Sequence, residues 1–219
     1  MVERSRITGL VLAGGQGSRL GGIDKGLQDF AGQPLAQHAL QRLAPQVGHV
    51  MISANRHLDI YRGMGADVWP DASSEGAYEG PLAGFLSGLA HCETPYLVTV
   101  PCDCPHFPID LVQRLALALE TEAADVAIAA LRHDGKLQLE PAFCLMKREL
   151  HPSLQRYLQT GQRKIERWTA EQHRTTVMFD DAPAFFNINT PEELAMLRSH
   201  QNIEGRYPVH HSGFPPSRE

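Results

Sequence analysis

The sequence has no long hydrophobic run, no surplus of basic residues and no secretory start. No apolar stretch approaches the ~20 residues needed to span a bilayer, so no membrane partner is expected. The first ten residues contain no long apolar segment before a small-residue cleavage site, and we therefore expect a cytoplasmic protein. Twenty Lys and Arg, scattered among 25 Asp and Glu, give a net charge of −5, which disfavours nucleic-acid binding.

Cysteine and histidine patterns supply no metal motif. Four cysteines in 219 residues are too few for a disulfide framework. Cys102 and Cys104 are also too closely spaced for the usual zinc knuckle, so we expect reduced thiols. The eleven histidines include no H-E-x-x-H and no pair at i, i+4. We therefore assign the histidines no catalytic or metal-binding role.

Composition predicts a folded chain with one domain. The hydrophobic share is 42%, the charged share is 21% and the mean hydropathy is −0.26, as in globular proteins. We expect residues 1–200 to form one α/β domain. Apolar periodicity stops near residue 201, and prolines and glycines follow, so residues 201–219 are expected to be a disordered tail. Residues 203–206 (IEGR) resemble an engineered protease site, which leaves the origin of the tail open between native and added sequence.

Apolar periodicity predicts alternating strands and helices. Two segments with three-or-four spacing predict helices around residues 35–43 and 111–119. Seven β-branched runs predict strands over residues 7–13, 49–53, 66–69, 96–100, 125–131, 140–146 and 175–179. This order favours a Rossmann-like, three-layer α/β/α domain with a mainly parallel sheet. Asp134-Gly135 predicts a tight hairpin and thus one antiparallel excursion. Such sheets bind ligands at the carboxyl ends of their strands, which here are the loops after Leu12 and Val100.

A glycine-rich segment follows the first predicted strand. Residues 12–26 are LAGGQGSRLGGIDKG, with six glycines from Gly14 to Gly26. Glycine backbone can approach phosphate oxygens closely, and Arg19 and Lys25 would neutralise their charge. A flexible surface turn is the alternative. A Walker A loop is disfavoured because Lys25 is not followed by Ser or Thr, and a dinucleotide fingerprint because the glycine spacing is one residue too long.

Two polar segments lie where later strands are predicted to end. Asp103, in the sequence PCDCP, follows the strand over 96–100 and could hold Mg²⁺ for a triphosphate. An Asx turn or helix cap would explain Asp103 equally well. Residues 186–194 (FNINTPEEL) predict a short strand leading into a helix, on which Asn187 and Asn189 would point the same way. They could present oxygens to a metal or an acceptor, or simply form a turn.

Together these segments resemble a known enzyme family. Residues 12–25 resemble the L-A-G-G-x-x-x-R-[ML]-G-x-D-K loop of transferases that couple a nucleotide to a phosphorylated acceptor. The paired glycines at the start of the loop and GIDKG at its end resemble the corresponding loop of the molybdenum cofactor guanylyltransferases (MobA type). Cytidylyl relatives usually have Ala-Ala-Gly there. PCDCP and NINTPEEL are also similar to motifs of that family, and the resemblance spans residues 8–197.

The resemblance implies a fold of the nucleotide-diphospho-sugar transferase type and a reaction. The enzyme would transfer GMP from GTP to the phosphate of molybdopterin and release pyrophosphate, with Mg²⁺ bound by Asp103. Asp103, Lys25 and Arg19 would be catalytic, and Asn187 and Asn189 would serve the metal or the acceptor. The implied nucleotide-binding residues are Leu12, Ala13, Gly14, Gly15, Lys25, Asn55, Asp71 and Asp103.

Weaker similarities and alternatives accompany this interpretation. Residues 80–84 (GPLAG) are similar to a turn of this family that lies beside the base or ribose. Residues 140–143 are similar to the family's acceptor-side strand, although a buried strand with an edge proline would explain these residues as well. The protein partners implied are molybdenum-insertion proteins and apo-molybdoenzymes or their chaperones, with the chain a monomer or weak oligomer. A cytidylyl- or sugar-phosphate transferase and a non-catalytic nucleotide- or pterin-binding module remain as alternatives.

Overall fold

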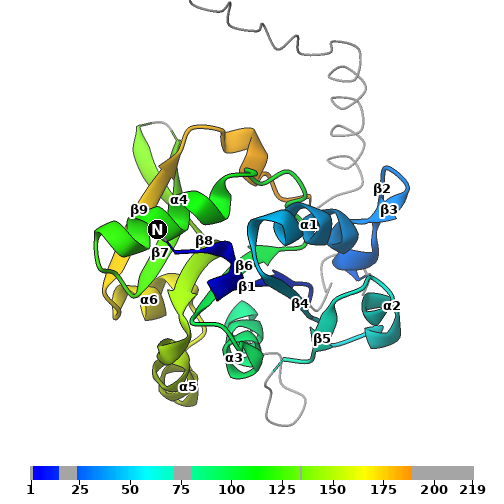
Figure 1. Ribbon diagram of the computed structural model, residues 1–219, viewed down its shortest axis with the longest axis horizontal. Helices are drawn as coiled ribbons and strands as arrows, with labels where there is room; N and C mark the ends of the chain where they lie inside the picture. The colour runs from blue at the N-terminus through cyan, green and yellow to red at the C-terminus, as the bar shows by residue number, and fades with distance from the viewer. Residues whose placement is uncertain (1, 15–23, 72–79, 134, 189–219) are drawn as a thin grey trace, which may run out of the picture. The chain divides into compact units, whose positions relative to one another are not determined.

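The computed structural model describes residues 2–14, 24–71, 80–133 and 135–188, and Met1–Asn187 form one compact unit. Its centre is a seven-stranded sheet of order β5-β4-β1-β6-β8-β7-β9, in which only β8 runs antiparallel to its neighbours (Figure 1). The strands are β1 Ile7–Leu12, β4 His49–Ser53, β5 Asp67–Trp69, β6 Tyr96–Pro101, β7 Val126–His133, β8 Lys136–Lys147 and β9 Arg174–Phe179. All seven expected strands and the mainly parallel sheet are confirmed.

Helices cover both faces of this sheet. They are α1 Leu35–Leu43, α2 Leu58–Arg62, α3 Pro81–His91, α4 Leu111–Thr121, α5 His151–Gln159 and α6 Ile165–Ala170. Side chains alternate along β1, so Ile7 and Val11 belong to the core cluster that includes α1 and α4, whereas Leu10 belongs to the cluster that includes α3, α5 and α6. Figure 1 shows these two helical groups on opposite sides of the strands. The predicted three-layer α/β/α architecture is therefore confirmed.

The expected hairpin joins β7 to β8. His133 pairs with Lys136, and Gly135 between them has a φ of +75°, which suits a two-residue turn. Asp134 lies outside the described residues. Farther along, the pairing passes from Ile128 opposite Cys144 to Ala129 opposite Glu140, which leaves a bulge at residues 141–143. The edge position considered for Pro141 is therefore wrong: β8 is an interior strand, and the bulge accommodates the proline.

A small hairpin that the sequence pattern does not indicate precedes α1. The strands β2 Asp29–Phe30 and β3 Gln33–Pro34 pair around Ala31 and Gly32, which both have positive φ. Ala-Gly is a weaker turn signal than Asn-Gly because alanine rarely adopts positive φ. The hairpin connects the segment that contains Lys25 to α1, where the Leu35 amide donates to the Gln28 carbonyl at 3.0 Å.

The parallel strands end in one row, and this row positions the candidate site. Leu12 pairs with both Ser53 and Pro101, and Ser53 pairs with Trp69. From β1 the chain proceeds outward to β4 and β5 and then returns to the other side of β1 as β6. This reversal creates a switch point at the carboxyl ends of β1 and β6, where ligands of α/β sheets bind. Among the described residues, no helix is long and apolar enough to cross a membrane.

Candidate active site

Backbone hydrogen bonds carry the parallel pairing beyond the strand ends. The amide of Ala13 donates to the Ser53 carbonyl at 2.8 Å, and the amide of Cys102 donates to the Leu12 carbonyl at 3.1 Å. The amide of Ala54 likewise donates to the Trp69 carbonyl at 3.1 Å. The residues that follow β1, β4, β5 and β6 are therefore held along one edge of the sheet.

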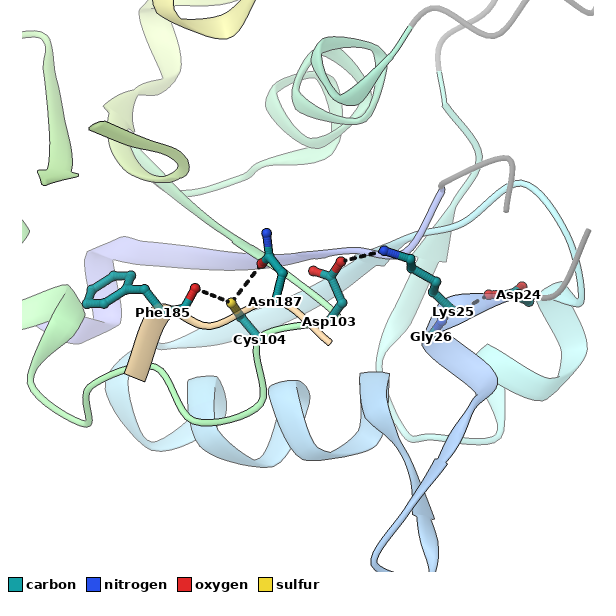
Figure 2. A network of polar contacts seen from close by, with 7 residues as sticks. All are labelled: Asp24, Lys25, Gly26, Asp103, Cys104, Phe185 and Asn187. Atoms are coloured by element: carbon teal, nitrogen blue, oxygen red, sulfur yellow. Dashed lines mark hydrogen bonds and ion pairs between the residues drawn. The ribbon is translucent and has the colours of Figure 1, made fainter. Parts of the chain in front are cut away.

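Lys25 and Asp103 meet at this edge. Lys25 Nζ lies 3.1 Å from Asp103 Oδ2, with side-chain exposures of 28% and 17%. They come from segments 78 residues apart in the chain, Lys25 from the far end of the glycine-rich segment and Asp103 from the turn after β6 (Figure 2). The structure thus places a cation and a carboxylate, both accessible to solvent, at the switch point. Such a pair can contact phosphate oxygens and a dication at once.

Asn55 and Asp71 bind each other at the neighbouring strand ends. Asp71 accepts hydrogen bonds from Ser53 Oγ at 2.5 Å and from Asn55 Nδ2 at 2.7 Å, and its amide donates to Asn55 Oδ1 at 2.8 Å. Asn55 Nδ2 also donates to the Gly14 carbonyl at 3.2 Å. A Cβ on Gly14 would lie only 3.0 Å from Asp71 Oδ2, so glycine permits this close approach. These contacts position the first part of the glycine-rich segment; the nucleotide contacts expected of Asn55 and Asp71 stay predictions.

Asn187 lies beside the turn that contains Asp103. The Cys104 thiol, completely buried, is 3.0 Å from Asn187 Oδ1 and 3.1 Å from the Phe185 carbonyl (Figure 2). A 3₁₀ helix over Ala182–Phe185, capped by Asp181 through the Ala184 amide, leads into Asn187. Phe186–Ile188 belong to no strand, so the short strand expected there is wrong, because a capped helical turn with Pro183 precedes them instead.

Three predicted site residues lie outside the described residues: Gly15, Arg19 and Asn189. The residues that are described hold no cluster of three His, Cys, Asp or Glu able to bind a metal. Mg²⁺ bound with a triphosphate needs only one or two protein carboxylates, since phosphates and waters complete its shell. Asp103 supplies a carboxylate of the right chemistry, and Asn187, whose Oδ1 faces the Cys104 thiol, lies beside the same turn. The four cysteines are free and buried, which confirms the expected thiols.

Glu140 is a further acidic residue near this turn. It is half-buried, and its negative charge contributes to the raised pKa of the Cys104 thiol, after burial and Asp103. Burial raises the pKa of the Glu140 carboxyl itself, and a hydrogen bond of 2.8 Å from Gln138 opposes this shift. The folded protein therefore holds the charged carboxylate at a cost that the unfolded chain does not have.

We expect Glu140→Gln to stabilise the protein at neutral pH. The pKa of Glu140 is higher in the folded protein than in the unfolded chain. The free energy of unfolding therefore falls as the pH rises between these two pKa values, and Glu140 does not change it below both of them. A gain of ~1 kcal/mol in the free energy of unfolding would raise the Tm of a chain of this size by ~2 to 4 °C, and we expect a smaller gain than that. The gain should vanish below about pH 4, where the carboxyl is protonated in both the folded and the unfolded state. Thermal unfolding over a pH series measures it, with the exposed Glu171→Gln as control. A variant no more stable than the parent at neutral pH contradicts the expectation.

Comparison with known proteins places these residues in a family context. Residues 9–176 match the model of the MobA-like NTP transferase domain. A molybdenum cofactor guanylyltransferase from Bordetella petrii is 57% identical over 197 residues, which is 90% of this chain and the whole of that protein. The protein of the same name from Bordetella pertussis is 56% identical over 91% of this chain and all of its own length.

Solved structures show the same fold. The molybdopterin-guanine dinucleotide biosynthesis protein A from Archaeoglobus fulgidus superposes with a TM-score of 0.71 at 23% identity, over 90% of this chain and 99% of that one. The 4-diphosphocytidyl-2C-methyl-D-erythritol synthase from Anaerococcus prevotii gives 0.71 at 12% identity, over 90% and 96%. At these identities the likeness concerns the fold alone, which these two proteins share with this chain. The expected fold of the nucleotide-diphospho-sugar transferase type is confirmed.

Proposed function

This chain belongs to the MobA-like NTP transferase family, and from that premise we propose that it is a molybdenum cofactor guanylyltransferase. It transfers GMP from GTP to the phosphate of molybdopterin and releases pyrophosphate. The observation that carries the proposal is the approach of Lys25 to Asp103 at the switch point of the sheet. Identities of 57% and 56% to proteins with this name favour the guanylyl activity over the cytidylyl one, which the fold alone does not separate.

The reaction needs positioning and charge neutralisation more than covalent help from the protein. An oxygen of the molybdopterin phosphate attacks the α-phosphorus of GTP and forms the new P–O bond. The bond from the α-phosphorus to the bridging oxygen breaks, and pyrophosphate leaves with its electron pair. No side-chain nucleophile is required. Lys25 would neutralise the phosphate oxygens, whose charge shifts as the leaving group departs.

Mg²⁺ dependence is part of the proposal. Asp103 would hold the ion together with the triphosphate, because its carboxylate supplies the oxygen donors that Mg²⁺ prefers, and Asn187 would serve the metal or the acceptor. When bound, the ion would neutralise charge on the reacting phosphates. The roles expected of Gly15, Arg19 and Asn189 stay predictions, as do the protein partners, the oligomeric state and the cytoplasmic location.

Pyrophosphate release tests this function directly. With GTP, Mg²⁺ and molybdopterin we expect turnover, with loss of turnover on chelation by EDTA and recovery when Mg²⁺ is restored. A nucleotide panel separates the alternatives: faster turnover of CTP than of GTP would overturn the guanylyl assignment. GTP binding without magnesium-dependent pyrophosphate release would instead indicate a non-catalytic binding module.

A further inference from the structure

We propose that the connection that runs from the end of β4 into α2 (residues 55–61) holds both ends of the glycine-rich segment, and that Tyr61 acts there as a positioning residue for Lys25 through Asp24. Tyr61 lies on α2, and its hydroxyl donates to Asp24 Oδ1 at 2.6 Å. The sequence pattern does not indicate this contact, because it joins positions 37 apart. The inference rests on the proposed function of Lys25.

The contact between Tyr61 and Asp24 is buried and involves an acceptor that can carry charge. Tyr61 is completely buried and Asp24 is 8% exposed. Burial raises the pKa of the Tyr61 hydroxyl, and the hydrogen bond to Asp24 raises it further, so the hydroxyl stays protonated and remains a donor. A buried hydrogen bond to a charged group contributes more than a neutral one, and removing the donor leaves the carboxylate poorly solvated.

Asp24 fixes the backbone on both sides of Lys25. The same Oδ1 accepts a hydrogen bond from the Gly26 amide at 3.2 Å, and the Asp24 carbonyl accepts one from the Leu27 amide at 3.2 Å. These bonds begin the 3₁₀ helix Lys25–Leu27. A Cβ on Gly26 would collide with the Tyr61 hydroxyl, so the close approach requires glycine. Figure 2 shows the Asp24–Gly26 bond on one side of Lys25 and Asp103 on the other.

The same connection also reaches the other end of the glycine-rich segment. Asn55, which follows β4, donates to the Gly14 carbonyl at 3.2 Å. Between Asn55 and Tyr61 the chain turns at His57, whose φ is +51° and whose carbonyl accepts bonds from the amides of Ile60 and Tyr61. One short connection therefore contacts residue 14 and residue 24. We infer that it sets the positions of both ends, and hence where Lys25 stands relative to Asp103.

Tyr61→Phe tests the role of the hydroxyl because it keeps the buried ring. We expect kcat/KM for GTP, with Mg²⁺ and molybdopterin, to fall about 10-fold, the effect of losing a hydrogen bond to a charged group. The matched control is Tyr157→Phe: Tyr157 is also buried, and its hydroxyl donates to the Lys164 carbonyl at 3.1 Å on the α5 side of the sheet. The control should change kcat/KM by less than about twofold, since its hydroxyl is remote from the site.

A double-mutant cycle separates positioning from a general structural effect. If Tyr61 acts through Lys25, adding Tyr61→Phe to Lys25→Met should change the residual kcat/KM by less than about twofold. Additive losses in the double variant would overturn the inference, as would full activity of Tyr61→Phe in the parent. The residual activity is measured at raised enzyme concentration so that each corner of the cycle is quantified.

An activity-independent readout distinguishes failure of this inference from failure of the proposed function. Hydrogen exchange of the Gly26 amide, followed by NMR, should be about 10-fold faster in Tyr61→Phe and unchanged in Tyr157→Phe, because Asp24 loses its second donor. If the parent protein releases no pyrophosphate from GTP while Gly26 exchange accelerates, the function is wrong and the structural coupling stands. Unchanged exchange at Gly26 in Tyr61→Phe overturns the coupling itself.

Discussion

Asp103→Asn should lower kcat/KM for magnesium-dependent pyrophosphate release by ~10²- to 10³-fold, the usual cost of losing one preorganised electrostatic contact. The substitution keeps the size of the side chain and removes its charge. Lys25 then faces a neutral amide instead of the carboxylate 3.1 Å away, and the proposed ion loses its anionic protein ligand. Steady-state kinetics over a range of Mg²⁺ concentrations should also show a weaker response to the metal.

The same substitution should leave the fold almost unaffected. Asp103 and Lys25 retain 17% and 28% exposure, and partly solvated ion pairs contribute ~0 to 1 kcal/mol. The expected change in Tm is therefore below ~4 °C. A loss of Tm large enough to unfold the variant at the assay temperature would remove the functional interpretation. Full activity in a folded Asp103→Asn protein would remove the metal assignment.

A second lysine–aspartate pair provides the control for this experiment. Lys147 Nζ lies 2.8 Å from Asp125 Oδ1, and the two side chains are 32% and 36% exposed. Asp125 immediately precedes β7, so this pair lies at the edge of the sheet where the parallel strands begin. Asp125→Asn makes the same chemical change as Asp103→Asn, and we expect it to change kcat/KM by less than about twofold because it is remote from the strand ends.

The sequence predicted those features that depend on local pattern or on a general rule of sheets. Apolar periodicity identified the seven strands, and Asp134-Gly135 identified the β7–β8 hairpin. The rule that parallel strands end at one edge of a sheet predicted that Lys25 and Asp103 lie close together. No local sequence pattern around either residue indicates the other. Local hydrophobic order and strand direction together therefore located the candidate site.

Features set by tertiary contacts could not be predicted in this way. The pairing of Tyr61 with Asp24 depends on how α2 packs against the end of the glycine-rich segment. The position of Pro141 inside the sheet depends on a bulge that the apolar run does not indicate. Phe186–Ile188 form no strand, although one was expected there, and the sequence pattern did not indicate the capped 3₁₀ turn over Ala182–Phe185 that precedes them. In each case a distant or competing local contact outweighed the pattern.

Lys25→Met tests the other half of the ion pair and should cost ~10²- to 10³-fold in kcat/KM. Methionine keeps an unbranched apolar chain of similar length, so the change isolates the positive charge that faces the phosphates. Lys147→Met is the matched control, because it breaks a pair of similar exposure at the opposite edge. Its own loss should stay within about twofold, since surface ion pairs contribute little. Equal losses in the two lysine variants would show a general effect of net charge.

Combining Lys25→Met with Asp103→Asn shows whether the two residues serve one step. If Lys25 and Asp103 act together on the same phosphates, the double variant should lose far less than the product of the single losses, because each single change already disables the shared arrangement. Multiplicative losses would instead indicate independent contributions, with Lys25 binding GTP and Asp103 acting elsewhere. Measuring the Kd for GTP in all four proteins separates the cases, since an interaction made only in the transition state lowers kcat without weakening nucleotide binding.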